Sequence, residues 1–287
     1  MKPVLLLLAA LTLNAQTKKV WTAEEMFRRN IGTAGQLDKQ FPPYKVIGNI
    51  YYVGTESLAS FLISTPEGLI LVNSDYERNV PTIRDSVEKL GFKFADIKIL
   101  LGSHAHGDHM EGDALVKELT GATVMAMEQD VPALKRITPG GKPHPIDRVL
   151  HDGDEVTLGG TTLVAHLTPG HTRGCTTWTM KVKEGSGTYS VVIIGSVGVN
   201  PGFQLVNNTQ NPQILDEYRQ AYKVLRALPC DVPLGSHPAM YNMQEKFAKI
   251  GKGANPFIDP AGYKEELDTQ EELFNRILAD QQKAAQK

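Results

Sequence analysis

Short apolar runs bounded by turn residues dominate the chain from residue 44 to residue 101. Runs of four or five apolar or aromatic residues between glycine, asparagine and proline are typical of β-strands. Gly48-Asn49 and Pro66-Glu67-Gly68 each separate two such runs, which predicts two hairpins. The strands predicted in this half are 44–47, 50–53, 60–63, 69–72 and 97–101.

Other segments show helical spacing instead. Between residues 80 and 90, apolar side chains recur three or four positions apart and Gly91 follows them, which predicts a helix. The same reasoning predicts helices over 114–119 and 216–228, and a packing helix in the tail from Tyr263 onward.

The second half of the chain repeats this rhythm of strands followed by helix. Two sheet-rich halves with no linker between them favour one domain over residues 16–287, an α/β protein built as a four-layer αββα sandwich. Residues 17–40 and 130–148 are predicted to be irregular, with Trp21 and Phe27 anchoring the first of these segments. The strands predicted beyond residue 101 are 123–127, 155–158, 161–166, 176–180, 191–194 and 232–234.

The N-terminus has the pattern of a secretory signal peptide. Lys2 precedes the apolar run 4–13, and the small residue Ala15 follows it. The run is too short to span a bilayer, which takes about 20 residues. We therefore expect cleavage after residues 1–15 and a periplasmic protein; the alternative is a buried N-terminal strand or helix.

The charge balance excludes one class of partner. Thirty basic and 32 acidic residues give a net charge of −2, without the basic footprint of a nucleic-acid-binding protein. We expect a monomer that binds a small molecule, without nucleic acid or membrane partners. The only two cysteines, Cys175 and Cys230, both lie at predicted strand starts, and export favours a disulfide between them. The alternative is two buried, inert thiols.

Residues 104–109 read His104-Ala105-His106-Gly107-Asp108-His109, four metal-ligand types in six positions. In an extended segment, side chains two residues apart share one side, so His104 and His106 can bind one metal ion. The following turn lets Asp108 and His109 face a neighbouring site. Imidazole with carboxylate suits zinc or iron.

Two of the remaining histidines are further candidate ligands. His171 ends the tight turn Thr168-Pro169-Gly170, and His237 follows Gly235-Ser236 directly after an apolar strand. The other three are left without a functional role. They are His144, predicted in a surface loop, His151, predicted to cap a turn, and His166, predicted as a core or edge strand residue.

These motifs together resemble those of the metallo-beta-lactamase superfamily. The His-x-His-x-Asp-His hexapeptide, Pro169-Gly170-His171-Thr172 and the strand-terminal Gly235-Ser236-His237 carry the resemblance. Tyr51-Tyr52-Val53-Gly54-Thr55 and the segment 195–202 narrow it to the third subclass of class B beta-lactamases. The resemblance runs from about Tyr44 to His237.

The resemblance implies two zinc ions and six ligands. His104, His106 and His171 would hold the first ion. Asp108, His109 and His237 would hold the second.

Ser196 is the position that separates the subclasses in this resemblance. Many related hydrolases place a bridging aspartate in this region, and the other beta-lactamase subclasses place a cysteine ligand there. The implied catalytic residues are Asp108 and Ser196, and the implied substrate-binding residues are Ser196, Asn200 and Thr172. The alternative for Ser196 is an ordinary small turn residue.

Three positions depart from the family pattern. Gly107 stands where an aromatic residue is common, and Gly198 where a serine often binds the substrate carboxylate. Asn73-Ser74-Asp75 replaces a common Asp-Thr-Gly, so the contacts that other residues make with the metal ligands are expected to be rearranged. None of these departures removes a ligand.

The implied activity is zinc-dependent hydrolysis of the amide bond of beta-lactam antibiotics, including cephalosporins, carbapenems and penicillins, by a metal-activated hydroxide. The segment 130–148, Trp21 and Phe203 are expected to line the substrate groove. The leading alternative is another zinc hydrolase of the same fold, a lactonase, thioesterase or phosphodiesterase. Two weaker alternatives are a zinc-binding protein without turnover and a di-iron oxidoreductase.

Overall fold

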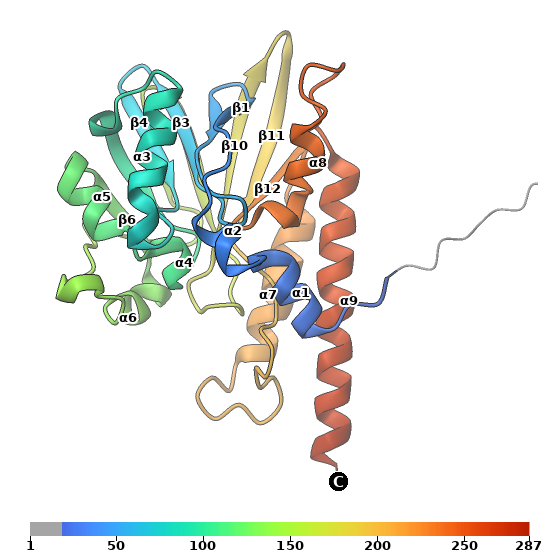
Figure 1. The fold of residues 1–287 in the computed structure, drawn as a ribbon. Coiled ribbons are helices and arrows are strands. Elements are labelled where there is room, and N and C mark those ends of the chain that lie inside the picture. Colours follow the sequence, from blue (N-terminus) through green and yellow to red (C-terminus); the bar gives the residue numbers. More distant parts are fainter. Residues whose placement is uncertain (1–18, 287) are drawn as a thin grey trace, which may run out of the picture.

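Two β-sheets pack face to face, and helices cover their outer faces (Figure 1). The computed structural model describes residues 19–286, so the predicted signal peptide, 1–15, lies outside the described residues. The αββα sandwich predicted from the sequence is confirmed. Among the helices of the described residues, none combines the length and the apolar character needed to cross a membrane.

The first sheet has seven strands in sequence order. Both predicted hairpins are present, with Tyr44 opposite Tyr52 in one and Phe61 opposite Val72 in the other. From the fourth strand onward the pairing is parallel, so these strands end at the same edge of the sheet. The strands are β1 (Tyr44–Ile47), β2 (Ile50–Tyr52), β3 (Phe61–Thr65), β4 (Gly68–Val72), β5 (Ile97–Leu101), β6 (Thr123–Met127) and β7 (Arg148–Leu150).

The second sheet has five strands in the order β12-β11-β10-β9-β8. The hairpin of β10 and β11 is longer than predicted, because alternating residues such as Lys181 and Lys183 continue the strand beyond the buried core. The strands are β8 (Glu155–Leu158), β9 (Thr161–Leu167), β10 (Thr176–Glu184), β11 (Gly187–Ile194) and β12 (Val232–Gly235).

The helices complete the two outer layers. Apolar residues of α3 (Val80–Lys89) and α5 (Asp113–Thr120) form one buried cluster with the outer face of the first sheet. The larger cluster lies between the sheets and extends to α7 (Ile214–Ala227) and α9 (Pro260–Ala285), whose Tyr218 and Phe274 rings stack 5.1 Å apart. Shorter helices are α4 (Gly107–Met110), α6 (Val131–Leu134) and α8 (Met243–Phe247), with 3₁₀ turns η1 (Glu77–Asn79), η2 (Phe94–Asp96), η3 (Glu128–Asp130), η4 (Pro139–Gly141) and η5 (Pro238–Tyr241).

The prediction of an irregular segment over 17–40 is wrong. This part of the chain forms α1 (Ala23–Ile31) and α2 (Ala34–Asp38). Thr22 and Glu25 form a capping box at the start of α1, a signal that the sequence contains. The buried anchor is Met26, 1 % exposed, and not Phe27, which is 37 % exposed.

His144 is not a surface residue, as its position between prolines had suggested. Its side chain is buried, and its Nε2 atom lies 3.0 Å from Oδ2 of Asp113. Ser74 donates its hydroxyl to the other oxygen of Asp113, at 2.6 Å. His144 thus ties the segment 130–148 to α5, and that segment also contains α6 and the start of β7.

The predicted disulfide is absent, because both cysteines are free. The Cys175 thiol donates to the carbonyl oxygen of Ser196, beyond the end of β11, whereas Cys230 precedes β12, whose Val232 pairs with Val191 in the middle of β11. Ser196 and Val191 are five positions apart, or about 16 Å along the sheet. A disulfide requires Cα atoms within about 7 Å. β10 starts beside the last residues of β11, because it runs antiparallel to that strand, whereas the parallel β12 starts beside its middle.

Candidate metal centre

The candidate ligands lie just beyond the ends of strands from both sheets. The hexapeptide follows β5, His171 follows β9, and His237 follows β12. Glycine and proline in these connections turn the chain sharply at the sheet edge. Residues far apart in the sequence therefore meet at the edge that joins the two sheets.

His104, His106 and His171 form one cluster. Each offers a ring nitrogen, and these three atoms lie within 4.8 Å of one another. The His171 ring lies 4.6 Å from that of His104 and 4.8 Å from that of His106, measured between centroids, and is nearly perpendicular to both. Three imidazoles converging on one point can bind a zinc ion and leave a fourth position open.

Asp108, His109 and His237 form a second cluster beside the first, again with ligand atoms within 4.8 Å. Oδ2 of Asp108 lies 3.3 Å from Nε2 of His109 and 3.8 Å from Nε2 of His237. The rings of His104 and His109 are 4.3 Å apart, so the two clusters adjoin. The structure thus brings together all six residues in the two sets that the resemblance implies.

Three of the histidines are oriented through Nδ1. His171 donates from Nδ1 to the carbonyl oxygen of Gly198 at 2.7 Å, and His237 to that of Ser57 at 3.0 Å. Nδ1 of His104 lies 3.2 Å from the hydroxyl of Ser103. A histidine held through one ring nitrogen presents the other to a metal, the usual arrangement around protein-bound zinc.

Several ligand atoms have no hydrogen-bond partner among the described residues. They are Nε2 of His104 and both ring nitrogens of His109, and all are buried. A buried polar atom without a partner costs free energy. A bound cation would supply the missing partner, so the residues present fit a metal centre.

The electrostatics keep the ligands in their metal-binding forms. Burial and neighbouring histidines lower the pKa of His104 well below its usual value. The same causes lower the pKa of His171 to about 3; burial and His109 lower that of His237 to about 4. Burial raises the pKa of Asp108, but His109 and His237 outweigh it, so the carboxylate pKa is lowered overall. Neutral imidazoles and an ionised carboxylate are what zinc requires.

Asp130 is a functional residue that sequence reasoning missed. Its Oδ2 atom accepts from the Ala105 amide at 2.9 Å and the Thr172 hydroxyl at 2.8 Å, and Oδ1 accepts from the Gly174 amide at 2.7 Å. One carboxylate thus joins the loop of His104 and His106 to that of His171. Burial raises its pKa despite these three bonds. No local motif signals this role, because the three donors come from distant segments.

A cavity of about 160 Å³ opens beside the ligands. Ser196 and Asn200, two of the implied substrate-binding residues, line it, whereas the hydroxyl of the third, Thr172, donates to Asp130. Trp21 and Phe203 are not among the described residues that line this cavity. Tyr76 does line it, and a Cβ atom at Gly107 would lie 3.4 Å from the Tyr76 ring. Tyr76 thus places an aromatic ring beside Gly107, the position where related enzymes often have an aromatic residue.

An αββα sandwich with two adjoining clusters of zinc-type ligands at one sheet edge defines a class of metalloproteins. Comparison with known families agrees with this. The family model of the Metallo-beta-lactamase superfamily matches residues 54–237. The chain therefore belongs to the metallo-beta-lactamase superfamily, as its motifs predict.

Solved structures place the similarity within one subclass. The metallo-beta-lactamase FEZ-1 of Legionella gormanii is 49 % identical, with a TM-score of 0.82 over 85 % of this chain and 98 % of that one. BJP-1 of Bradyrhizobium japonicum, a subclass B3 metallo-beta-lactamase, is 40 % identical, with a TM-score of 0.80 over 87 % and 98 %. The predicted resemblance to the third subclass is confirmed.

Curated relatives match over shorter stretches. The hydroxyacylglutathione hydrolase of Rhizobium meliloti is 33 % identical over 92 residues, which are 32 % of this chain and 31 % of that protein. That of Brucella ovis is 31 % identical over 113 residues, 39 % of each chain. The matched stretch thus spans about a third of the length of these curated relatives.

Proposed function

We propose that this protein is a zinc-dependent beta-lactamase that hydrolyses the amide bond of beta-lactam antibiotics. The observation that carries the proposal is the pair of adjoining ligand clusters in a cavity that Ser196 lines. Similarity to FEZ-1 and to the subclass B3 enzyme BJP-1 over 98 % of each of those chains supports the same substrate class.

Two zinc ions would be held by the two clusters. His104, His106 and His171 would bind one ion, and Asp108, His109 and His237 the other. When bound, zinc supplies Lewis acidity that activates water and polarises a carbonyl oxygen at neutral pH. Nε2 of His104 and one ring nitrogen of His109, both buried without a hydrogen-bond partner, are among the atoms that would coordinate it.

The side chains around the clusters have roles of their own. Ionised Asp108 can accept a hydrogen bond from the attacking water and aim its oxygen at the lactam carbonyl carbon. Addition of water breaks the C–N bond, giving a carboxylate and an amine that takes up a proton. Ser196 and Asn200, which line the cavity, offer a hydroxyl and an amide to the polar groups of the substrate.

A thioesterase is the second candidate, because the curated hydroxyacylglutathione hydrolases match part of the chain. The same clusters would serve attack on a thioester carbonyl. Position 196, two residues after the end of β11, favours the lactamase, because many superfamily hydrolases have a bridging aspartate in this region and this chain has serine.

We also propose that the protein is exported to the periplasm and acts as a monomer. The apolar run 4–13 with Lys2 before it and Ala15 after it supports export. Sequencing the N-terminus of protein recovered from the periplasm tests this. A mature chain that begins near residue 16 is expected.

The deciding experiment is turnover of a cephalosporin, a carbapenem and a glutathione thioester by zinc-loaded protein. We expect lactam hydrolysis that a chelator abolishes and added zinc restores. His171→Ala should abolish it, whereas His151→Ala, a matched change at an exposed histidine outside the clusters, should not. Thioester turnover without lactam turnover would instead establish the second candidate.

A further inference from the structure

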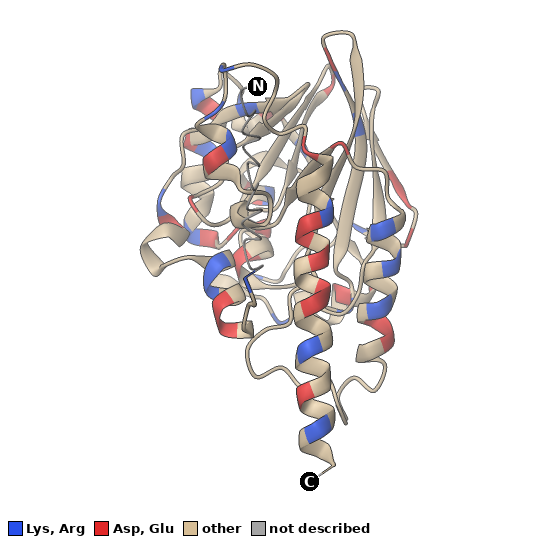
Figure 2. Ribbon diagram, turned by 90° about the vertical axis from the view of Figure 1, so that its right-hand side faces the viewer, with Lys and Arg blue, Asp and Glu red and all other residues tan. Residues whose placement is uncertain are grey.

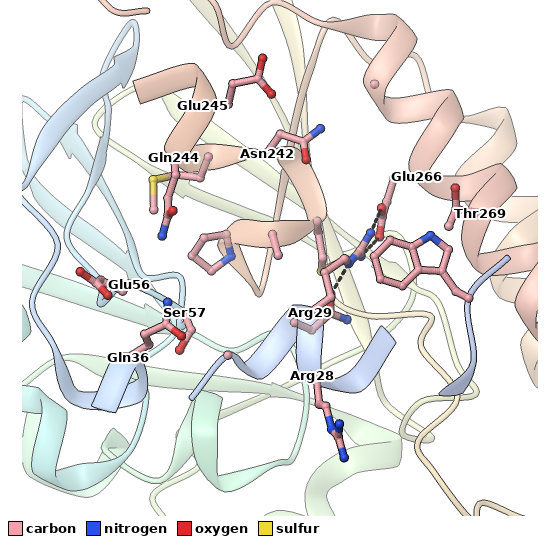
Figure 3. A pocket seen from close by; sticks show the side chains of 18 of the residues that line it. Arg28, Arg29, Gln36, Glu56, Ser57, Asn242, Gln244, Glu245, Glu266 and Thr269 are labelled. Carbon is pink, nitrogen blue, oxygen red and sulfur yellow. Dashed lines mark hydrogen bonds and ion pairs between the residues drawn. The ribbon is translucent and has the colours of Figure 1, made fainter. Parts of the chain in front are cut away.

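Helix α1 separates the small cavity at the metal centre from a much larger cleft. The inner cavity, about 160 Å³, is lined by Phe27, Asn30 and Ile31 of this helix. The cleft on its other side measures about 720 Å³ and is bounded by α1, η5, α8 and α9 (Figure 3). Asn30 lines both the cavity and the cleft, so α1 alone separates them at this point.

An ion pair ties this wall to the long C-terminal helix. Nη1 of Arg29 lies 2.8 Å from Oε2 of Glu266 in α9, and Nη2 lies 2.5 Å from Oε1 (Figure 3). The two side chains are only 18 % and 8 % exposed, and Gln270 donates to Oε1 of Glu266 at 2.8 Å. A bidentate, mostly buried pair of this kind is stronger and more directional than a surface ion pair.

The same guanidinium orients Asn30. Nε of Arg29 donates to Oδ1 of Asn30 at 3.0 Å, which fixes the rotamer of a residue that lines the inner cavity. With its oxygen bound to Arg29, the N–H groups of the Asn30 amide are the ones suited to a substrate oxygen. A continuous set of contacts therefore runs from Glu266 through Arg29 to the cavity wall.

The inner cavity is small for an antibiotic. Sites for drug-sized ligands usually measure about 300 to 1,000 Å³, so 160 Å³ fits the reacting ring and little of its side chains. A larger substituent must pass along α1 or displace it toward the cleft. The helix has only nine residues. Gly32 caps its C-terminal end with a φ of 64°, a backbone conformation that residues other than glycine rarely adopt.

We propose that Arg29 and Glu266 form a latch that sets the position of α1 as the substrate wall, and that Asn30 is a substrate-binding residue held by this latch. Arg29 and Glu266 are positioning residues, because they act through α1 and Asn30. The proposal rests on the proposed lactamase function for the identity of the substrate. The latch itself can be tested without any substrate.

The first test is hydrogen exchange of the α1 amides in the full-length protein. Arg29→Lys keeps the charge but loses the paired hydrogen bonds, and Glu266→Gln removes the charge. We expect the α1 amides of both variants to exchange at least about tenfold faster than those of the wild type. This is the effect expected from the loss of one charge-assisted hydrogen bond. Glu265→Gln, the same change at the exposed neighbouring residue, should match the wild type.

The second test compares two cephalosporins that share a nucleus and differ in side-chain bulk. Arg29→Lys should lower the ratio of the KM for the bulky substrate to the KM for the small substrate by about threefold or more, with kcat and zinc content unchanged. Asn30→Ala should raise KM for both by about three- to tenfold, the effect of one lost hydrogen bond. A merely structural role would instead change both substrates equally and affect kcat.

The outcomes separate the latch from the proposed function. Unchanged α1 exchange in both latch variants would overturn the latch. Faster exchange with an unchanged ratio of the two KM values would overturn its role in substrate selection. A wild-type enzyme without lactam turnover would overturn the proposed function, and the exchange comparison would still decide whether the latch exists.

Discussion

At the scale of single residues, the backbone supplies much of the ligand geometry. The carbonyl oxygens of Ser57 and Gly198 hold His237 and His171 through Nδ1. Gly198 is fixed in turn, because the Tyr218 hydroxyl donates to the same carbonyl oxygen at 3.0 Å. Glycine at position 198 thus lacks the serine side chain that is common in the family, but its backbone carbonyl still orients His171.

His237→Ala should reduce occupancy of the second cluster more than that of the first. Elemental analysis should then find about one zinc per chain where the wild type binds two. His171→Ala is the matched change in the first cluster, and cobalt substitution would show different spectra for the two variants. Equal loss from both clusters in the His237 variant would contradict the assignment of ligands to two sets.

At the scale of elements, the loops that carry the ligands are held by residues that are not ligands. Asp130 joins the loop after β5 to the loop after β9. His144 ties the segment 130–148 to Asp113 in α5, and Ser74 donates to the same carboxylate. The backbone amide of Ser74 donates to the carbonyl oxygen of His109, so this buried network reaches the second cluster.

His144→Ala should lower the free energy of unfolding by at least about 2 kcal/mol, because it leaves a carboxylate oxygen of Asp113 buried without its partner. Urea denaturation measures the loss. His151→Ala, at an exposed histidine, should change stability by less than about 0.5 kcal/mol. Equal stability of the two variants would show that the buried pair does not hold the segment.

At the scale of the whole molecule, the metal centre joins the two sheets. His104, His106, Asp108 and His109 follow the first sheet, whereas His171 and His237 follow strands of the second. Each ligand cluster takes members from both sheets. Bound metal would therefore cross-link the two halves of the molecule. Basic and acidic side chains are both spread over the helices (Figure 2), in keeping with the net charge of −2.

Metal removal should lower the unfolding temperature of the whole protein. At a free metal concentration 1,000 times Kd, binding adds about 4 kcal/mol, which corresponds to a shift of about 10 °C for a domain of this size. Calorimetry before and after chelation measures the shift, and added zinc should reverse it. A verified metal-free protein with an unchanged unfolding temperature would show that metal binding does not couple the halves.

Local patterns determined most of the elements and the identity of the ligands. Runs of apolar residues between turns predicted the paired strands from β1 to β6, and the capping box of α1 is an equally local signal. The hexapeptide, Pro169-Gly170-His171 and Gly235-Ser236-His237 marked all six candidate ligands. Such signals are readable because strand, helix and turn preferences depend on residues within a few positions of one another.

Only the tertiary structure decided which distant groups meet. Sheet register and strand direction separated Cys175 from Cys230, and loop packing buried His144 against Asp113. The same packing placed Asp130 between two ligand loops and brought Arg29 to Glu266 across 237 positions of sequence. Distances of this kind depend on how whole elements pack, and a single sequence carries no local signal for them.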